Sequence, residues 1–444
     1  MTIKGGTGSG EVNERHSVSI LEGLEDRGFE ITSRKWIEDF EKSYAQELAA
    51  YNENKKKQIN ILNLKNIMQM MFDNFSGSIG RAVTQEDVDS SDTDTCIYVL
   101  SRQAGEGGDR KAEKGDFFLT DEEEATIRFC ARNYEKFVLV INCGSAMDME
   151  FADRIEGINA ILHLCQPGTE GGHAFADVIS GAVTPSGKLA DTWAKKYEDV
   201  PFGDQFSYLN GDLKNEYYKE GIYVGYRYFD SFGVSPAYPF GYGLSYTDFH
   251  IRFVSLTAAG SVVTVAAEVE NTGKYPGKEV AQLYVSAPAG RLHKEYQQLA
   301  AFEKTVLLAP GESELVSLTF DLTDLASYRE KDGCFVLEKG DYVLRLGNSS
   351  RNTFAAAVVE LPADVTVSKH RHICPVQQPV QELEAPAREE EDLSGAVRCP
   401  MDVSGFQTVF HTYKEPDICR DVRVRQWLKK LTVPDMVDIV VGVG

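Results

Sequence analysis

The stretch from Thr95 to Arg110 limits the possible folds most strongly, because an apolar run is followed at once by a glycine-rich segment. Cys96 to Leu100 is unbroken in its apolar character and contains β-branched and aromatic residues, which is typical of a strand buried on both faces of a parallel sheet. The glycines that follow flank a single carboxylate, Glu106. Ligands of open α/β sheets bind just beyond the carboxyl ends of the strands, so chemistry is expected at Glu106. The alternative is an ordinary glycine turn that carries a solvated glutamate.

Further strands and helices alternate along the first half of the chain. The apolar runs Phe137–Ile141 and Ile158–Leu164 predict two more strands. Thr120 and Glu123 form a capping box at the start of one helix, and Gly181 ends another. This alternation predicts a largely parallel sheet with helices on both faces. A longer helix before the sheet has one stripe expected to be buried, formed by Trp36, Phe40, Tyr44 and Leu48.

The loop from Ser101 to Arg110, SRQAGEGGDR, resembles the acid/base loop of glycoside hydrolase family 3, the β-glucosidase family. Further segments resemble that family's motifs in the family's order: PGTEGG at 167–172, PSGKL at 185–189, EGIYVGYRYF at 220–229 and PFGYGLSY at 239–246. The resemblance extends to about Thr353. It implies that Glu106 is the general acid/base and that Arg102, Asp109 and Arg110 contact the substrate.

The pattern changes near residue 248 to short alternating strands separated by turns such as Pro310-Gly311-Glu312, which predicts an all-β sandwich. Gly277–Val285 and Gly340–Gly347 resemble the fibronectin type III-like domain that accompanies many family 3 enzymes. The expected fold class is therefore multidomain α/β plus all-β. A mostly parallel α/β sandwich domain occupies residues 1–247, and an immunoglobulin/fibronectin III-like β-sandwich occupies residues 248–362.

The remaining residues are expected to form a linker and the start of another domain. Residues 363–420 carry prolines and the acidic run from Glu389 to Asp392, which is typical of a linker or extended arm. Residues 421–444 faintly resemble the opening helix of the family's (β/α)₈ barrel. This implies a permuted domain order of sandwich, fibronectin-like domain and barrel. The glycine loop that begins at Gly5 has no strand before it, so we expect a chain truncated at both ends.

The aromatic stretch from Tyr217 to Tyr246 allows two interpretations. Sugar rings stack on aromatic faces, so a carbohydrate platform is one of them. The other is packing of this stretch against a neighbouring domain, which requires the same residue types and which we favour.

Charge and composition exclude several classes of function. The net charge of −22 disfavours nucleic acid as a partner, since phosphates are bound by lysine and arginine. No apolar run is long enough for a membrane span, the start lacks a signal-peptide pattern, and the eight cysteines show no paired spacing. We therefore expect a cytoplasmic protein without a membrane partner. His370, His372 and Cys374 lack a fourth ligand, and no nucleotide-binding pattern is complete, so neither a metal nor a cofactor is expected.

The resemblance also implies what the chain lacks. Retaining hydrolysis needs a nucleophilic carboxylate about 5 Å from the acid. In the family that aspartate lies on the barrel in a Ser-Asp-Trp context, and none of Trp36, Trp193 and Trp427 follows Ser-Asp. The expected function is part of an enzyme that removes terminal β-linked glucosyl or xylosyl groups from oligosaccharides or glycosides, nearly inactive by itself. The alternative is a non-catalytic carbohydrate-binding or adhesion module with the same two domains.

Overall fold

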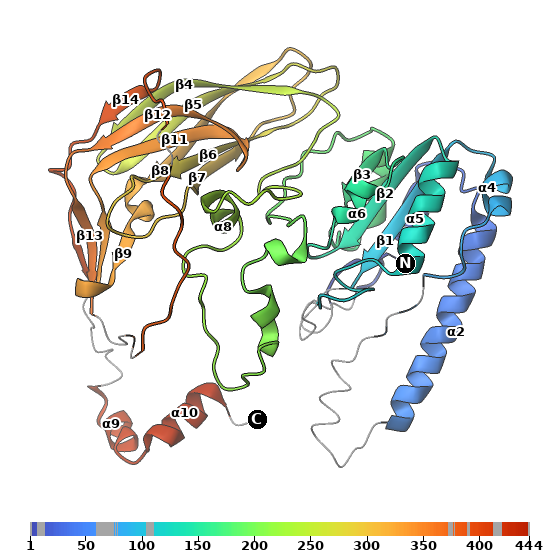
Figure 1. The fold of residues 1–444 in the computed structure, drawn as a ribbon, viewed down its shortest axis with the longest axis horizontal. Helices are drawn as coiled ribbons and strands as arrows, with labels where there is room; N and C mark the ends of the chain where they lie inside the picture. The colour runs from blue at the N-terminus through green and yellow to red at the C-terminus, as the bar shows by residue number, and fades with distance from the viewer. Residues whose placement is uncertain are drawn as a thin grey trace.

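The computed structural model describes residues 2–6, 14–58, 75, 77, 79–103, 111–371, 376, 378–388, 391–411 and 420–442. These residues form an α/β region and a β region, which lie side by side in Figure 1. This is the architecture predicted from the sequence. None of the helices in the described ranges is long and apolar enough to span a membrane.

A three-stranded parallel sheet forms the centre of the α/β region. Its strands are β1 (Thr95–Arg102), β2 (Lys136–Cys143) and β3 (Ala160–His163), and they pair in the order β1-β2-β3. Alternate residues of β2 enter different cores. Val140 packs with α1 (Ile20–Asp26) and α7 (Gly171–Ile179), whereas Leu139 and Ile141 pack with α5 (Asp121–Asn133) and α6 (Glu150–Arg154). The sheet is therefore covered by helices on both faces, as predicted.

Helices α1 and α7 approach each other so closely that only glycine fits at their contact. A Cβ atom at Gly23 would lie 2.1 Å from the carbonyl carbon of Gly172, and one at Gly172 would lie 2.0 Å from the carbonyl oxygen of Ser19. This contact explains Gly172, the last glycine of the PGTEGG segment. Ser19 and Glu22 form a capping box at the start of α1, and Thr120 and Glu123 form the one predicted for α5.

Helix α2 (Arg34–Gln58) differs from the prediction, because it has no buried residue. Its aromatic side chains do form a stripe: the rings of Trp36 and Phe40 stack at 5.7 Å, and Tyr44 contacts Phe75 edge-on at 5.2 Å. The stripe is thus half-buried along the helix. The short helix α4 (Gln85–Ser91) leads from this part of the chain into β1.

The aromatic stretch before the β region mainly packs the two regions together. It contains α8 (Tyr226–Ser231) and follows two 3₁₀ turns, η2 (Tyr197–Asp199) and η3 (Gly203–Tyr208). Tyr226 stacks on Phe240 at 4.8 Å, and its hydroxyl oxygen accepts a hydrogen bond from the backbone amide of Leu299 in the β region at 2.9 Å. Tyr218 is 80% exposed and stands apart from this packing.

The β region contains three sheets around one apolar core. The first has β4 (Phe249–Ala259), β5 (Val262–Asn271) and β8 (Ser313–Asp321) in the order β4-β5-β8. The second has the order β14-β12-β11-β6-β7, formed by β6 (Val280–Ser286), β7 (Gln298–Lys304), β11 (Gly340–Ser349), β12 (Asn352–Leu361) and β14 (Val397–Pro400). The third has the order β15-β13-β10-β9, formed by β9 (Ser327–Arg329), β10 (Cys334–Leu337), β13 (Val365–His370) and β15 (Val409–His411).

The segment predicted as a linker, residues 363–420, differs from a linker because it contributes strands to two of these sheets. β14 pairs with β12, while β13 pairs with β10 and with β15. Between β13 and β14, residues 378–388 form a segment that we call the strap. Its Leu383 donates its backbone amide to the carbonyl of Lys219, and its Arg388 donates to the carbonyls of Ala287 and Glu295. The strap therefore contacts both regions.

The last described residues form α9 (Val422–Leu428) and α10 (Val433–Val441), neither of which has a buried residue. Helix α10 begins with a Thr432–Asp435 capping box and exposes Val440 and Val441. Its assignment to a barrel stays a prediction.

A buried carboxylate in the β region gives a testable pH dependence. Burial raises the pKa of Glu338, but hydrogen bonds from Lys294 and from the amides of Arg291 and Leu292 outweigh it and hold the pKa at about 2, below the ordinary 4.5. Because the folded-state pKa is depressed, the stabilisation is present above pH 4.5 and is lost as the pH falls towards 2. The stability deficit of Glu338→Gln should shrink by about 2 kcal/mol between pH 6 and pH 3. Native-state hydrogen exchange of β11 amides in both proteins measures this difference in stability. If the unmodified chain and Glu338→Gln lose the same stability between pH 6 and pH 3, the pKa of Glu338 is not depressed in the folded state.

Candidate functional site

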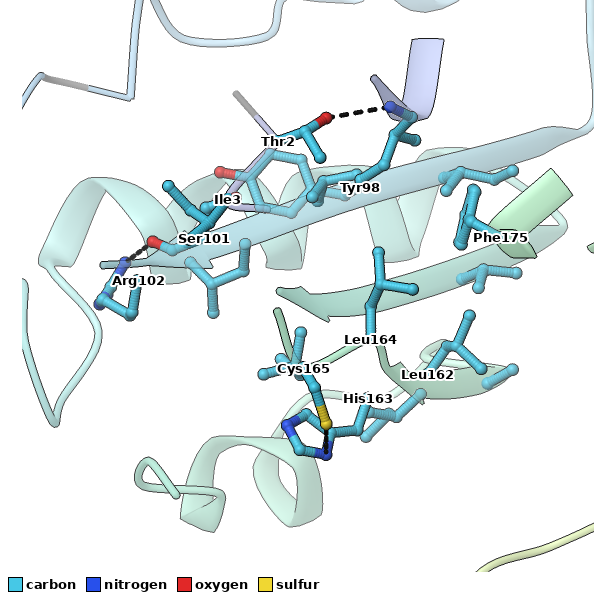
Figure 2. A pocket seen from close by; sticks show the side chains of 18 of the residues that line it. Thr2, Ile3, Tyr98, Ser101, Arg102, Leu162, His163, Leu164, Cys165 and Phe175 are labelled. Atoms are coloured by element: carbon cyan, nitrogen blue, oxygen red, sulfur yellow. Dashed lines mark hydrogen bonds between the residues drawn. The ribbon is translucent and has the colours of Figure 1, made fainter. Parts of the chain in front are cut away.

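The carboxyl ends of the three parallel strands form one rim, where Arg102, Cys143 and His163 end β1, β2 and β3. A hollow of about 3630 Å³ is lined by residues from all three strands. Figure 2 shows Ser101, Arg102, His163 and Cys165 around part of it. This rim is where ligands of open α/β sheets bind.

The residues predicted to carry the chemistry follow β1 directly. Glu106, Asp109 and Arg110 lie outside the described residues, and their roles stay predictions. The described chain ends at Gln103 and begins again at Lys111. The structure therefore shows how the residues on either side of residues 104–110 are held.

Arg102, predicted to contact the substrate, has a different set of partners. Its guanidinium donates two parallel hydrogen bonds to Glu123, from Nη1 at 2.7 Å and from Nη2 at 2.6 Å, and its Nε donates to the carbonyl of Asp116 at 2.9 Å. The side chains of Arg102 and Glu123 are only 8% and 3% exposed. This buried, bidentate pair ties Arg102 to helix α5, and the predicted contact of Arg102 with the substrate stays a prediction.

Asn142, near the end of β2, joins three segments at the rim. Its side-chain oxygen accepts the amide of Ile3 at 2.6 Å, and its side-chain nitrogen donates to the carbonyls of Ile3 at 2.9 Å and of Cys165 at 2.7 Å. Asn142 is fully buried. The amino-terminal segment and the turn after β3 are thereby fixed to the central strand. Sequence reasoning missed Asn142, although a polar residue that ends an apolar strand is a detectable signal.

His163 and Cys165 form a second polar pair that the sequence did not reveal. The Nε2 atom of His163 lies 3.0 Å from the carbonyl oxygen of Cys143, so this nitrogen carries the proton and Nδ1 is the acceptor. The Sγ atom of Cys165 lies 3.6 Å from Nδ1, as the dashed line in Figure 2 marks. Burial is the main cause that raises the pKa of the Cys165 thiol, and the nearby Asp191 and Cys143 raise it further. The thiol of Cys165 is therefore protonated at pH 7, unlike a thiolate nucleophile.

Glu170, in the PGTEGG segment, has a structural role. It lies at the N-cap of α7 and contacts Nδ1 of His173 at 2.8 Å, while Nε2 of His173 lies 3.0 Å from Asp26 of α1. Asp26 and then Glu170 raise the pKa of His173. This exposed triad links α1 and α7.

The described residues form no metal site. Within the described ranges, no three His, Cys, Asp or Glu side chains are grouped to hold an ion. His372 and Cys374 of the predicted weak cluster lie outside those ranges. Cys96, Cys130, Cys143, Cys165, Cys334 and Cys399 are described and have free thiols.

Comparison with known protein families assigns both regions of the chain. The model of the glycosyl hydrolase family 3 C-terminal domain matches residues 1–246, and the model of a fibronectin type III-like domain matches residues 279–350. Beta-glucosidase A of Butyrivibrio fibrisolvens is 34% identical over 398 residues, covering 79% of this chain and 45% of the relative. A beta-glucosidase of Ruminococcus albus is 34% identical over 365 residues, covering 79% of this chain and 35% of the relative.

Solved structures give the same relationship. The structure of beta-glucosidase 3B from Thermotoga neapolitana in complex with α-D-glucose has a TM-score of 0.69 and 37% identity, covering 82% of this chain and 49% of that chain. A beta-glucosidase from Paenibacillus barengoltzii also has a TM-score of 0.69, with 34% identity and 40% of its chain covered. The present chain thus spans less than half the length of these relatives.

The role of Asn142 can be tested directly. Asn142→Ala removes three hydrogen bonds and leaves the buried amide and carbonyl of Ile3 without this partner, which should cost about 3 kcal/mol. The amide of Ile3 should then exchange with solvent about 100-fold faster, measured by native-state hydrogen exchange. Asn133→Ala is the matched control, because the Asn133 side chain is exposed and makes one hydrogen bond, to the carbonyl of Phe129. Unchanged exchange at Ile3 in Asn142→Ala would show that the amide is held by other contacts.

Proposed function

The chain belongs to glycoside hydrolase family 3, and from this premise we propose that it forms part of a retaining glycosidase that removes terminal β-linked glucosyl or xylosyl groups. Glu106 is the general acid/base in this proposal. The relatives named above are beta-glucosidases, and one of the solved structures contains glucose, which supports a sugar substrate. The observation that carries the proposal is that β1 ends at Arg102, at the rim of the parallel sheet, only four positions before Glu106 in the sequence.

The ion pair at Arg102 supports the assignment electrostatically. A general acid must stay protonated near neutral pH, and a nearby unpaired cation would favour its ionised form. Arg102 is the described cation nearest to Glu106 in the sequence before it, and its charge is balanced by Glu123 at 2.6 Å. The pair therefore removes one influence that would lower the pKa of the acid.

The second carboxylate comes from elsewhere in this proposal. Retention of configuration requires a nucleophile about 5 Å from the acid. We place it on a barrel domain, as the resemblance implies, in the order sandwich, fibronectin-like domain, barrel. The chain spans 45% of Beta-glucosidase A from Butyrivibrio fibrisolvens. The cytoplasmic location expected from the sequence stays a prediction.

A chimera tests this assignment. Residues 1–411 replace the matched region of the Butyrivibrio enzyme, and kcat/KM is measured on aryl β-glucosides with good and poor leaving groups. Glu106→Gln should lower kcat/KM about 10²- to 10⁴-fold for poor leaving groups, which need protonation. It should leave kcat/KM nearly unchanged for a dinitrophenyl leaving group, and azide should restore turnover by replacing water as the second nucleophile.

Two further outcomes decide between enzyme and module. The 444-residue chain alone should hydrolyse none of these substrates, and turnover by it that Glu106→Gln abolishes would overturn the two-domain assignment. If Glu106→Gln lowers kcat/KM equally for all leaving groups, Glu106 is not the general acid. A matched variant, Glu113→Gln, changes an exposed carboxylate near the loop and should retain full activity.

A further inference from the structure

Asp116 contacts the chain on both sides of residues 104–110. Its backbone carbonyl accepts the Nε hydrogen of Arg102 at 2.9 Å. Its side-chain Oδ2 accepts the backbone amide of Lys111 at 2.8 Å. The last strand residue before the segment and the first described residue after it are thus joined through one amino acid.

The turn that carries Asp116 is itself held in place. The amide of Phe117 donates to the carbonyl of Lys111, and that of Phe118 donates to the carbonyl of Glu113. The carbonyl of Phe117 accepts the amide of Asp148, and its ring meets Tyr197 edge-on at 5.4 Å. Asp116 therefore lies on a turn that is anchored to Asp148, just before α6, and to η2.

Glu123 anchors the same frame to helix α5. Its carboxylate accepts both hydrogen bonds of the Arg102 fork and also the amide of Thr120 at 2.8 Å, so one side chain caps the helix and holds the end of β1. A buried carboxylate with this number of donors has a fixed orientation. The end of β1 is consequently tied to both α5 and the Asp116 turn.

We propose that Asp116 and Glu123 are positioning residues that hold the two ends of residues 104–110 and thereby aim Glu106 at the leaving group. The inference rests on the proposed function of Glu106. Neither residue needs to touch the substrate. Displacement of a catalytic group by about 1 Å can cost about 10²-fold in rate, so a frame of this kind has a measurable effect.

The first test uses the 444-residue chain and does not depend on activity. Asp116→Ala removes the acceptor of the Lys111 amide, whereas Asp116→Asn retains a side-chain oxygen in its place. Limited trypsin digestion followed by mass spectrometry should show cleavage after Lys111 about fivefold faster in Asp116→Ala, the effect of one lost hydrogen bond. Asp116→Asn should match the unmodified chain. Equal cleavage rates in all three proteins would show that Asp116 does not hold the chain at Lys111.

The second test uses the chimera and separates positioning from general destabilisation. Asp116→Ala and Glu123→Gln should lower kcat/KM about tenfold or more for poor leaving groups and less than threefold for dinitrophenyl β-glucoside, with Asp116→Asn restoring the former. Glu279→Gln is the matched control, because Glu279 forms a comparably buried ion pair with Lys188 at 2.7 Å, away from this turn. It should not alter the dependence on the leaving group.

The outcomes distinguish failure of this inference from failure of the proposed function. If Glu106→Gln behaves as an acid variant but Asp116→Ala and Glu123→Gln lower activity equally on all leaving groups, Asp116 and Glu123 have only a structural role and the inference is wrong. If Glu106→Gln itself shows no dependence on the leaving group, the proposed function fails, and the inference about aiming Glu106 fails with it.

Discussion

The buried amide of Asn142 is the interaction on which the α/β region most depends. A parallel sheet brings its strand ends to one edge but does not order the segments that leave that edge. Asn142 does so by bonding the amino-terminal segment at Ile3 and the turn after β3 at Cys165. Because these segments are 139 and 23 residues away, one side chain joins two distant segments to the central strand at the rim.

The same rim shows how charge is arranged around the proposed acid. A bidentate ion pair in a buried position is costly to desolvate and contributes little net stability, yet breaking it by loss of one partner is strongly destabilising. The pair between Arg102 and Glu123 therefore has more value as a fixed geometry than as a source of stability. It places a neutral, rigid unit at the end of β1, where a free cation would favour ionised carboxylates nearby.

Much of the fold could be predicted because its signals are local. The apolar runs gave β1 and β2, and the capping box at Thr120 gave the start of α5. Strands β13, β14 and β15 could not be found in the same way, since they are short and are stabilised by partners distant in the sequence. At the site, the motif predicted Arg102 as important, but its fork to Glu123 joins residues 21 positions apart and depends on tertiary structure.

The strap, residues 378–388, links the two regions over a short length of chain. Leu383 is hydrogen-bonded to the α/β region at Lys219, and Arg388, only five positions later, is hydrogen-bonded to the β region at Ala287. Five extended residues reach at most about 18 Å, so this crossing limits the distance between the two points at which the strap is bonded. Insertions upstream of Leu383 leave this limit unchanged, whereas an insertion between Leu383 and Arg388 would extend it and remove one of the constraints between the regions.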